Sequence, residues 1–207
     1  MKKILHIVAS PRNEASNSTR LGNEIIDKLK KQFPGSTVTL NNVVENDYSH
    51  LTQSHLIGYF TPLEDLTEKD LWAVQPSDAA VAELEEADFI VVSAPMYNFN
   101  IPSSLKAWID HIVRAGKTFS YKTGKPEGLL LNKKVYLAIA SNGVFSEGPV
   151  KSWDYAEPYL RFILGFLGLT DVTTFRIEGS GIPGVKEMAV QKGLDSVAAA
   201  LAVQEAV

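Results

Sequence analysis

Short apolar runs alternate with amphipathic segments along most of this chain of 207 residues. Strands buried in a parallel sheet have near-continuous apolar runs, whereas helices that cover a sheet repeat apolar residues every three or four positions. The apolar runs predict strands at 3–9, 37–43, 88–94, 133–140 and 171–178. Segments with helical spacing follow the strands, at 19–33, 77–86, 102–113, 155–167 and 185–204.

This alternation predicts an α/β fold, with a doubly wound five-stranded parallel sheet and helices on both faces. Because crossovers between parallel strands are right-handed, the expected strand order is 2-1-3-4-5. Residues 1–207 are interpreted as one domain with an insertion at about 44–76, which departs from the strand–helix rhythm and has helical stretches near 51–58 and 67–73. Ser77 is the expected N-cap of the next helix. Residues 117–130 are expected to be irregular or to form a small hairpin.

The composition narrows the possible chemistry. The chain has no cysteine, which excludes disulfides, thiolate catalysis and iron–sulfur clusters, so any redox activity needs a bound cofactor. A formal net charge of -4 argues against a nucleic-acid partner. The four histidines show no metal-ligand spacing, and we expect no metal. No apolar run approaches the roughly 20 residues that span a membrane, and the apolar stretch after Lys3 is too short for a signal peptide. We therefore expect a cytoplasmic protein without a membrane partner.

In a doubly wound sheet, the ligand lies beyond the carboxyl ends of the strands, at the switch between the first and third strands. The loops after the first, third and fourth strands should therefore converge. These loops are 10–18, 95–102 and 141–149.

The first loop places Ser10, Ser16, Asn17 and Ser18 just before a helix. A helix N-terminus has unpaired N–H groups and a partial positive charge, so these donors suit a phosphate monoester. The alternative is that the serines and the asparagine merely cap the helix.

The other two loops suit a flat ring. Met96, Tyr97 and Phe99 flank the polar Asn98, a composition that fits a heteroaromatic ring with hydrogen-bonding edges, or simple packing against the next helix. In the third loop, Gly143 allows close approach of the backbone to a ligand, although an ordinary turn would also use it.

These segments resemble the FMN-dependent NAD(P)H azoreductases and the related quinone reductases, which have a flavodoxin-like fold. The resemblance runs along nearly the whole chain. Its most specific piece is Ala94-Pro95-Met96-Tyr97-Asn98-Phe99-Asn100-Ile101-Pro102. Further pieces are Leu105-Lys106, Asp110, 114–119, 126–129, 147–149, Tyr159-Leu160, 166–168 and Glu178-Gly179.

The resemblance implies FMN as the cofactor and NADH or NADPH as the electron donor. It implies phosphate contacts from Ser10 and from Ser16, Asn17 and Ser18, and ring contacts from Met96, Tyr97, Asn98 and Phe99 and from Ser141, Asn142, Gly143 and Val144. The family's usual third loop is Ser/Ala-Arg-Gly-Gly, so Asn142 and Val144 are departures.

The implied reaction is a two-electron ping-pong reduction of quinones and reductive cleavage of aromatic azo compounds. The cofactor carries this chemistry, so no catalytic side chain is expected. Phe119, Tyr121 and Phe162 are candidates for an apolar substrate pocket. The resemblance also implies a homodimer with active sites at the interface, where the insertion helps to cover the partner's site.

The sequence also allows an electron carrier and contains a glycine-rich pattern. A flavodoxin-type FMN electron carrier without a small-molecule substrate would share the fold and the cofactor. Residues 179–184 match GxGxxG after a strand, but a dinucleotide-binding fingerprint needs a complete βαβ unit and a later acidic residue. Only one helix remains, so we do not interpret this match as a nucleotide site.

Overall fold

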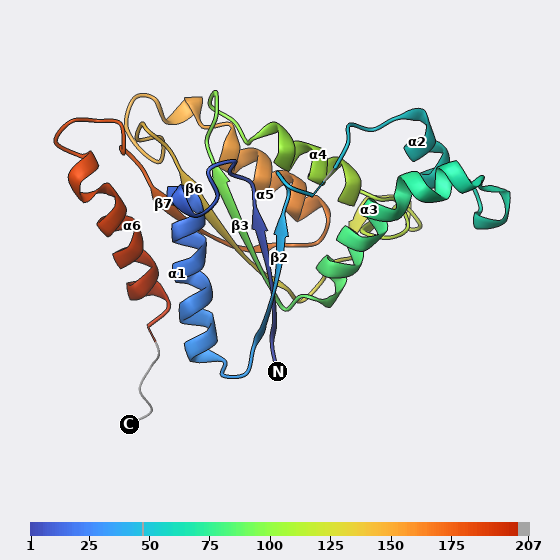
Figure 1. Cartoon of the computed structure of the whole chain (residues 1–207), viewed down its shortest axis with the longest axis horizontal. Coiled ribbons are helices and arrows are strands. Elements are labelled where there is room, and N and C mark those ends of the chain that lie inside the picture. The colour runs from blue at the N-terminus through green and yellow to red at the C-terminus, as the bar shows by residue number, and fades with distance from the viewer. Residues whose placement is uncertain (47, 203–207) are drawn as a thin grey trace.

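A five-stranded parallel sheet forms the centre of the computed structural model, which describes residues 1–46 and 48–202 (Figure 1). The strand order is β2-β1-β3-β6-β7, and every neighbouring pair in this sheet is parallel. Because β6 and β7 are the fourth and fifth strands of this sheet, the predicted order 2-1-3-4-5 is confirmed. The strands are β1 Lys3–Val8, β2 Thr37–Asn42, β3 Phe89–Pro95, β6 Lys134–Ala140 and β7 Asp171–Ile177.

Helices cover both faces of the sheet (Figure 1). On one face lie α1 Asn17–Gln32 and α6 Lys186–Ala200, and on the other lie α3 Glu68–Glu86, α4 Ser103–Ile112 and α5 Ala156–Phe166. The predicted final helix ends at Ala200, and positions 203–204 of that prediction lie outside the described residues. The remaining elements are α2 Gln53–Phe60, the short 3-10 helices η1 Asn13–Ala15, η2 Leu63–Asp65 and η3 Lys151–Trp153, and the antiparallel pair β4 Phe119–Ser120 and β5 Glu127–Gly128.

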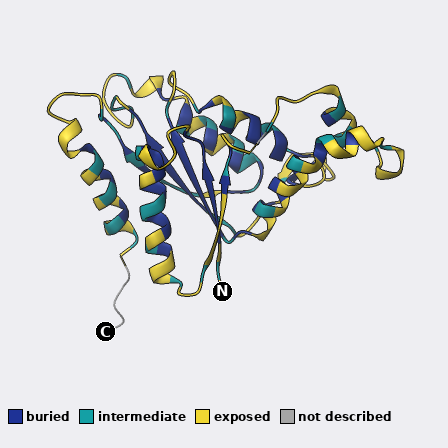
Figure 2. Ribbon diagram, in the orientation of Figure 1, coloured by how far each residue is buried: buried dark blue, intermediate teal, exposed yellow. Residues whose placement is uncertain are grey.

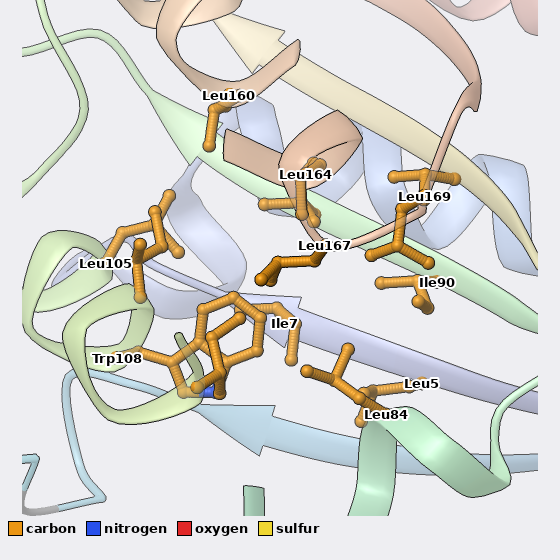
Figure 3. Packing of buried hydrophobic residues seen from close by; sticks show 14 of the residues in the cluster. Leu5, Ile7, Leu84, Ile90, Leu105, Trp108, Leu160, Leu164, Leu167 and Leu169 are labelled. Carbon is orange, nitrogen blue, oxygen red and sulfur yellow. The ribbon is translucent and has the colours of Figure 1, made fainter. Parts of the chain in front are cut away.

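The core divides at the sheet because side chains alternate along each strand. Leu5 and Ile7 of β1 point to the face that packs against Leu84, Trp108 and Leu164 of the α3, α4 and α5 layer (Figure 3). Ile4 points to the opposite face, toward α1 and α6. Strands β1, β3 and β6 are almost entirely buried, which explains why they appear as continuous apolar runs in the sequence, whereas the edge strands β2 and β7 are only partly buried (Figure 2).

The expectation that Ser77 caps a separate helix is wrong. Helix α3 is continuous from Glu68 to Glu86, and its N-cap is Thr67, whose hydroxyl accepts from the amide of Asp70 at 3.3 Å. Ser77 is fully buried inside α3, where its hydroxyl accepts from Arg114 at 2.6 Å and donates to the carbonyl of His111 at 2.5 Å. The helix continues through Pro76, which directly precedes the residue that was predicted to be the N-cap.

Helix α2 and the first part of α3 form an arm that projects from the sheet at the end opposite α6 (Figure 1). The arm corresponds to much of the predicted insertion. Figure 2 shows that much of its surface is exposed. Within the described residues, no helix is both long and apolar enough to span a bilayer.

Candidate functional site

Three loops meet where β1, β3 and β6 end. The amide of Ala9 donates to the carbonyl of Ser93 at 3.0 Å, which joins the end of β1 to β3. The amide of Met96 donates to the carbonyl of Ala140 at 2.8 Å, which joins the end of β3 to β6. The parallel registers thus bring together the segments that begin at Ser10, Met96 and Ser141.

The first loop buries its hydroxyl groups. Ser10, Ser16 and Ser18 are at most 4% exposed, and Asn17 is half-buried. The Oγ atoms of Ser16 and Ser18 lie 3.0 Å apart. Ser16 is the N-cap residue of α1, but its side chain accepts no capping hydrogen bond from a described residue. The simple capping alternative therefore does not account for the Ser16 hydroxyl.

The second loop holds a tight turn that exposes its side chains. Tyr97 and Asn100 exchange both backbone hydrogen bonds, at 2.9 and 3.0 Å. Between them, Asn98 and Phe99 have φ angles of 49° and 66°, a conformation that is costly for a residue with a bulky side chain. Tyr97 is 40% exposed and Phe99 45% exposed. Strained backbone combined with exposed aromatic rings at a strand end indicates a binding loop.

Aromatic rings connect the second loop to the third. The ring of Phe99 meets Phe145 and Trp153 edge-on, with centroid distances of 6.0 and 5.7 Å. The carbonyl of Phe99 also accepts from the amide of Tyr155 at 3.0 Å. These contacts form an aromatic rim, which we define as Phe99, Phe145 and Trp153.

The third loop directs its carbonyl groups toward the segment after β7. The carbonyl of Asn142 accepts from the amide of Gly181 at 3.0 Å, and that of Gly143 accepts from Gly179 at 3.0 Å. The carbonyl of Ser141 accepts from the hydroxyl of Ser180 at 3.2 Å. A trans peptide holds C=O and N–H on opposite sides, so the amides of residues 142–144 point away from 179–181. No described residue accepts from these three amides.

Cavities lie on both sides of these loops. One of about 610 Å³ adjoins Tyr97 and Asn98 and is also lined by Pro102, Lys106 and Tyr159. Another, of about 710 Å³, lies between β7 and α6, and Val144, Ser146 and Glu147 of the third loop contribute to its wall. The first cavity has the aromatic and amide lining that suits a flat polar ring.

The three predicted substrate-pocket residues have different environments. Phe119 is 9% exposed and packs on Phe166 with a centroid distance of 4.7 Å, so it belongs to the core. Tyr121 is 60% exposed and meets Phe119 edge-on at 5.5 Å. Phe162 is 71% exposed on α5. Phe119 and Tyr121 thus lie together, and their role in a substrate pocket stays a prediction.

Sequence reasoning missed two residues of the aromatic rim, Phe145 and Trp153. Both lie beyond the strand end, in or after the third loop, and aromatic side chains in such a polar stretch were the available signal. The sequence also did not show that Glu178 supports this loop. Its carboxylate accepts from the amides of Phe145 and Ser146 at 2.8 and 3.0 Å.

The fold and the three loops define a flavodoxin-like α/β protein with a binding site at the carboxyl ends of its strands. A family model described as flavodoxin-like fold matches residues 2–201. A curated FMN-dependent NADH:quinone oxidoreductase from Mesorhizobium japonicum is 42% identical over 204 residues, which cover 98% of this chain and 97% of that protein. The chain therefore belongs to the family of FMN-dependent NADH:quinone oxidoreductases.

Other relatives agree. The corresponding protein of Herminiimonas arsenicoxydans is 45% identical over 189 residues, covering 90% of this chain and 93% of that protein. Among solved structures, an azoreductase from Bacillus anthracis superposes with a TM-score of 0.89 at 33% identity, covering 97% of this chain and 99% of the other. An FMN-dependent NADH-azoreductase from the same species, solved in complex with FMN, has a TM-score of 0.87 at 24% identity and supports the fold.

Proposed function

We propose that this chain is an FMN-dependent oxidoreductase that takes two electrons from NADH and passes them to quinones and aromatic azo compounds. The observation that carries the proposal is the meeting of three loops with complementary chemistry at one end of the sheet. Buried hydroxyls, an exposed aromatic rim and unpaired amides match the phosphate, the ring and the polar ring edge of FMN. We infer NADH as the donor, and quinones and azo compounds as the acceptors, from the activities for which the similar proteins are named.

The residues present fit FMN at both of its ends. Ser10, Ser16 and Ser18 offer hydroxyls at the N-terminus of α1, where the helix dipole and unpaired N–H groups favour a phosphate. Tyr97, Asn98 and Phe99 would line the ring, and the amides of residues 142–144 would be available as donors to ring acceptors. The departures from the family pattern are compatible with this role, because Val144 does not have a positive φ and so does not require glycine.

Bound FMN supplies the two-electron chemistry, and the protein supplies binding and orientation. The 142–144 amides would stabilise negative charge at the polar edge of bound flavin, and the aromatic rim would shield one side of the site from water. A single surface that takes NADH and the acceptor in turn would give ping-pong kinetics. Lys106 lines the cavity beside Tyr97. Its Nζ lies 2.5 Å from Oδ1 of Asp110, so the positive charge at this cavity is paired with a carboxylate.

We further propose a homodimer in which the arm of one subunit covers the site of the other. The arm exposes large apolar side chains that a monomer would leave in water. Phe60, Leu63 and Trp72 are 74%, 73% and 75% exposed, and Leu56 is 49% exposed. A concentration of such side chains on a projecting element is typical of a protein interface. The cytoplasmic location stays a prediction.

Anaerobic stopped-flow spectroscopy tests the enzymatic part. Purified protein loaded with FMN should lose its flavin absorbance on mixing with NADH, and a quinone should restore it. Protein that binds FMN but is not reduced directly by NADH would instead support the electron-carrier alternative. A chain that does not retain added FMN through gel filtration would contradict both.

Light scattering coupled to gel filtration tests the dimer. Wild-type protein should elute with twice the mass of the chain, and the double variant Phe60→Ser, Trp72→Ser should elute as a monomer that still binds FMN. A suitable control is Leu131→Ser, since Leu131 is 59% exposed and lies outside the arm. A wild-type monomer, or equal behaviour of the arm and control variants, would contradict the proposed interface.

A further inference from the structure

Residues 179–181 form the first half of the GxGxxG match at 179–184. In the structure they contact the third loop. These three residues hold the carbonyls of 141–143 through the backbone, with N···O distances of 3.4, 3.0 and 3.0 Å. The hydroxyl of Ser180 also lies 3.2 Å from both the carbonyl of Ser141 and Oδ1 of Asn142. The glycines are needed for close approach, because a Cβ on Gly181 would lie 3.0 Å from the Cβ of Asn142.

The lack of a side chain at Gly179 leaves room for Val144 of the third loop. The φ of Gly179 is +76°, and a Cβ there would lie 2.6 Å from a methyl carbon of Val185 and 3.3 Å from one of Val144. The side chains of Val185 and Val144 thus occupy the space that a side chain at position 179 would need. A larger side chain at Gly179 would push Val144 and its amide out of place.

Glu178 holds the other end of the same loop. One carboxylate oxygen accepts from the amides of Phe145 and Ser146 at 2.8 and 3.0 Å, and the other accepts from the Ser146 hydroxyl at 2.5 Å. Glu178 is itself paired with Arg176 at 3.1 Å, and both side chains are nearly buried, at 11% and 12% exposure. Two separate attachments therefore flank the amides of residues 142–144.

Arg176 ties this support to helix α5. Its guanidinium also donates to Asp154 at 2.5 Å and to Glu157. Burial acts to raise the pKa of Glu157, but hydrogen bonds from Thr174, Arg176 and Arg161 outweigh burial and lower the pKa to about 2. Glu157 is thus ionised at neutral pH, and a network of opposite charges keeps Arg176 in position.

We propose that Glu178 and the turn 179–181 are positioning residues that orient the amides of Asn142, Gly143 and Val144 toward the polar edge of bound flavin. The inference rests on the proposed function. It gives a structural role to the first residues of the GxGxxG match at 179–184 and to Glu178-Gly179, one of the segments that carry the family resemblance. These residues act through the loop and do not themselves contact the flavin.

Two variants test the inference. Ser180→Ala removes only a hydroxyl from the support, and Glu178→Gln replaces the carboxylate with an amide that accepts through one oxygen only. Asp171→Asn is the matched control, because Asp171 is an exposed carboxylate at the other end of the same strand, paired with Lys134 at 2.8 Å. The readouts are hydrogen exchange, without flavin, of the hydrogen-bonded amides of Phe145, Ser146, Gly179 and Gly181, the Kd for FMN from its fluorescence, and the reduction potential.

Both variants should speed exchange of the amides that join the loop to its support and weaken FMN binding, by about fivefold for Ser180→Ala, the size expected for one hydrogen bond. Their reduction potential should become more negative, since poorly aimed amides stabilise the reduced flavin less. Simple loss of the Glu178 charge would make the potential more positive, so the sign separates positioning from a charge effect.

The outcomes separate this inference from the proposed function. Wild-type protein that fails to bind FMN contradicts the function. Wild-type protein that binds FMN, with a Ser180→Ala variant that matches Asp171→Asn in exchange, Kd and potential, overturns the positioning role. If Glu178→Gln does not fold, the comparison of Ser180→Ala with Asp171→Asn is sufficient to test the positioning role.

Discussion

The imidazole of His6 lies 2.8 Å from the hydroxyl of Ser93, and Gly22 of α1 packs directly over this pair. A Cβ on Gly22 would lie 2.0 Å from Oγ of Ser93 and 2.8 Å from Nε2 of His6. Both side chains are buried beneath the helix whose N-terminus carries the serines proposed to bind phosphate. The position of α1, and with it the first loop, therefore depends on a glycine in the middle of the helix.

We expect Gly22→Ala to destabilise the protein by about 2 kcal/mol or more, because neither neighbour can move away without disturbing the sheet. Gly165→Ala in α5 is the matched control, since a Cβ there meets nothing within 4 Å. That substitution should stabilise by about 0.5–1 kcal/mol because alanine favours a helix. Urea unfolding of both variants measures the difference. Equal midpoints would contradict the close packing at Gly22.

His6 should make stability depend on pH. Burial lowers its pKa from 6.5 to about 4, so the unfolded chain binds a proton more readily than the folded protein. The contribution of neutral His6 to the free energy of unfolding is fully present above pH 6.5 and is lost as the pH falls toward 4. The shift corresponds to on the order of 3 kcal/mol. Equilibrium unfolding between pH 7 and pH 4 measures this loss.

The variant His6→Gln should lack this component of the pH dependence, while His50→Gln should keep it because His50 is exposed. Subtracting the two profiles isolates the buried imidazole from the rest of the chain. A His6→Gln profile parallel to that of wild-type protein would show that His6 titrates normally.

Ser16 and Thr67 separate ligand binding from helix capping. Both are N-cap residues, but only the Thr67 side chain accepts from an amide of its own helix. We expect Ser16→Ala to weaken FMN binding by about 10-fold or more, with little change in the stability of the flavin-free protein. Thr67→Ala should instead lower stability by about 1 kcal/mol and leave the Kd for FMN unchanged. Calorimetry and fluorescence titration give both quantities, and a Ser16→Ala variant with unchanged Kd would contradict the phosphate site.

Local patterns predicted the elements and the location of the candidate site. The central strands could be recognised because both of their faces are buried, and the sheet order followed from the handedness of crossovers. The site loops followed because parallel strands end at one edge. Ser77 was wrongly predicted as an N-cap because serine favours that position, although the actual capping residues Thr67 and Asp70 were visible in the sequence.

Long-range contacts were not predictable from such patterns. Nothing near Gly22 in the sequence shows that Ser93 and His6 lie beneath it, because that contact depends on how α1 packs on β1 and β3. The positive φ of Phe99 is also unexpected, since aromatic residues rarely adopt it. It follows from the exchange of hydrogen bonds between Tyr97 and Asn100 and from ring contacts made with distant residues.

Phe119 and Phe162 were proposed for the same pocket, and their burial predicts opposite consequences of substitution. Phe119→Ala should cost about 3 kcal/mol, because its ring packs on Phe166 inside the core. Phe162→Ala should change stability by less than about 0.5 kcal/mol, because the side chain is largely exposed. The predicted role of Phe162 in the substrate pocket implies, however, that its loss should raise the KM for a quinone. The rate of flavin reduction by NADH should stay unchanged. Steady-state kinetics at a fixed NADH concentration measure the KM, with the exposed Leu131→Ala as a control. A Phe162→Ala enzyme with the KM of wild-type protein would remove Phe162 from the acceptor site and leave Tyr121 as the exposed aromatic candidate.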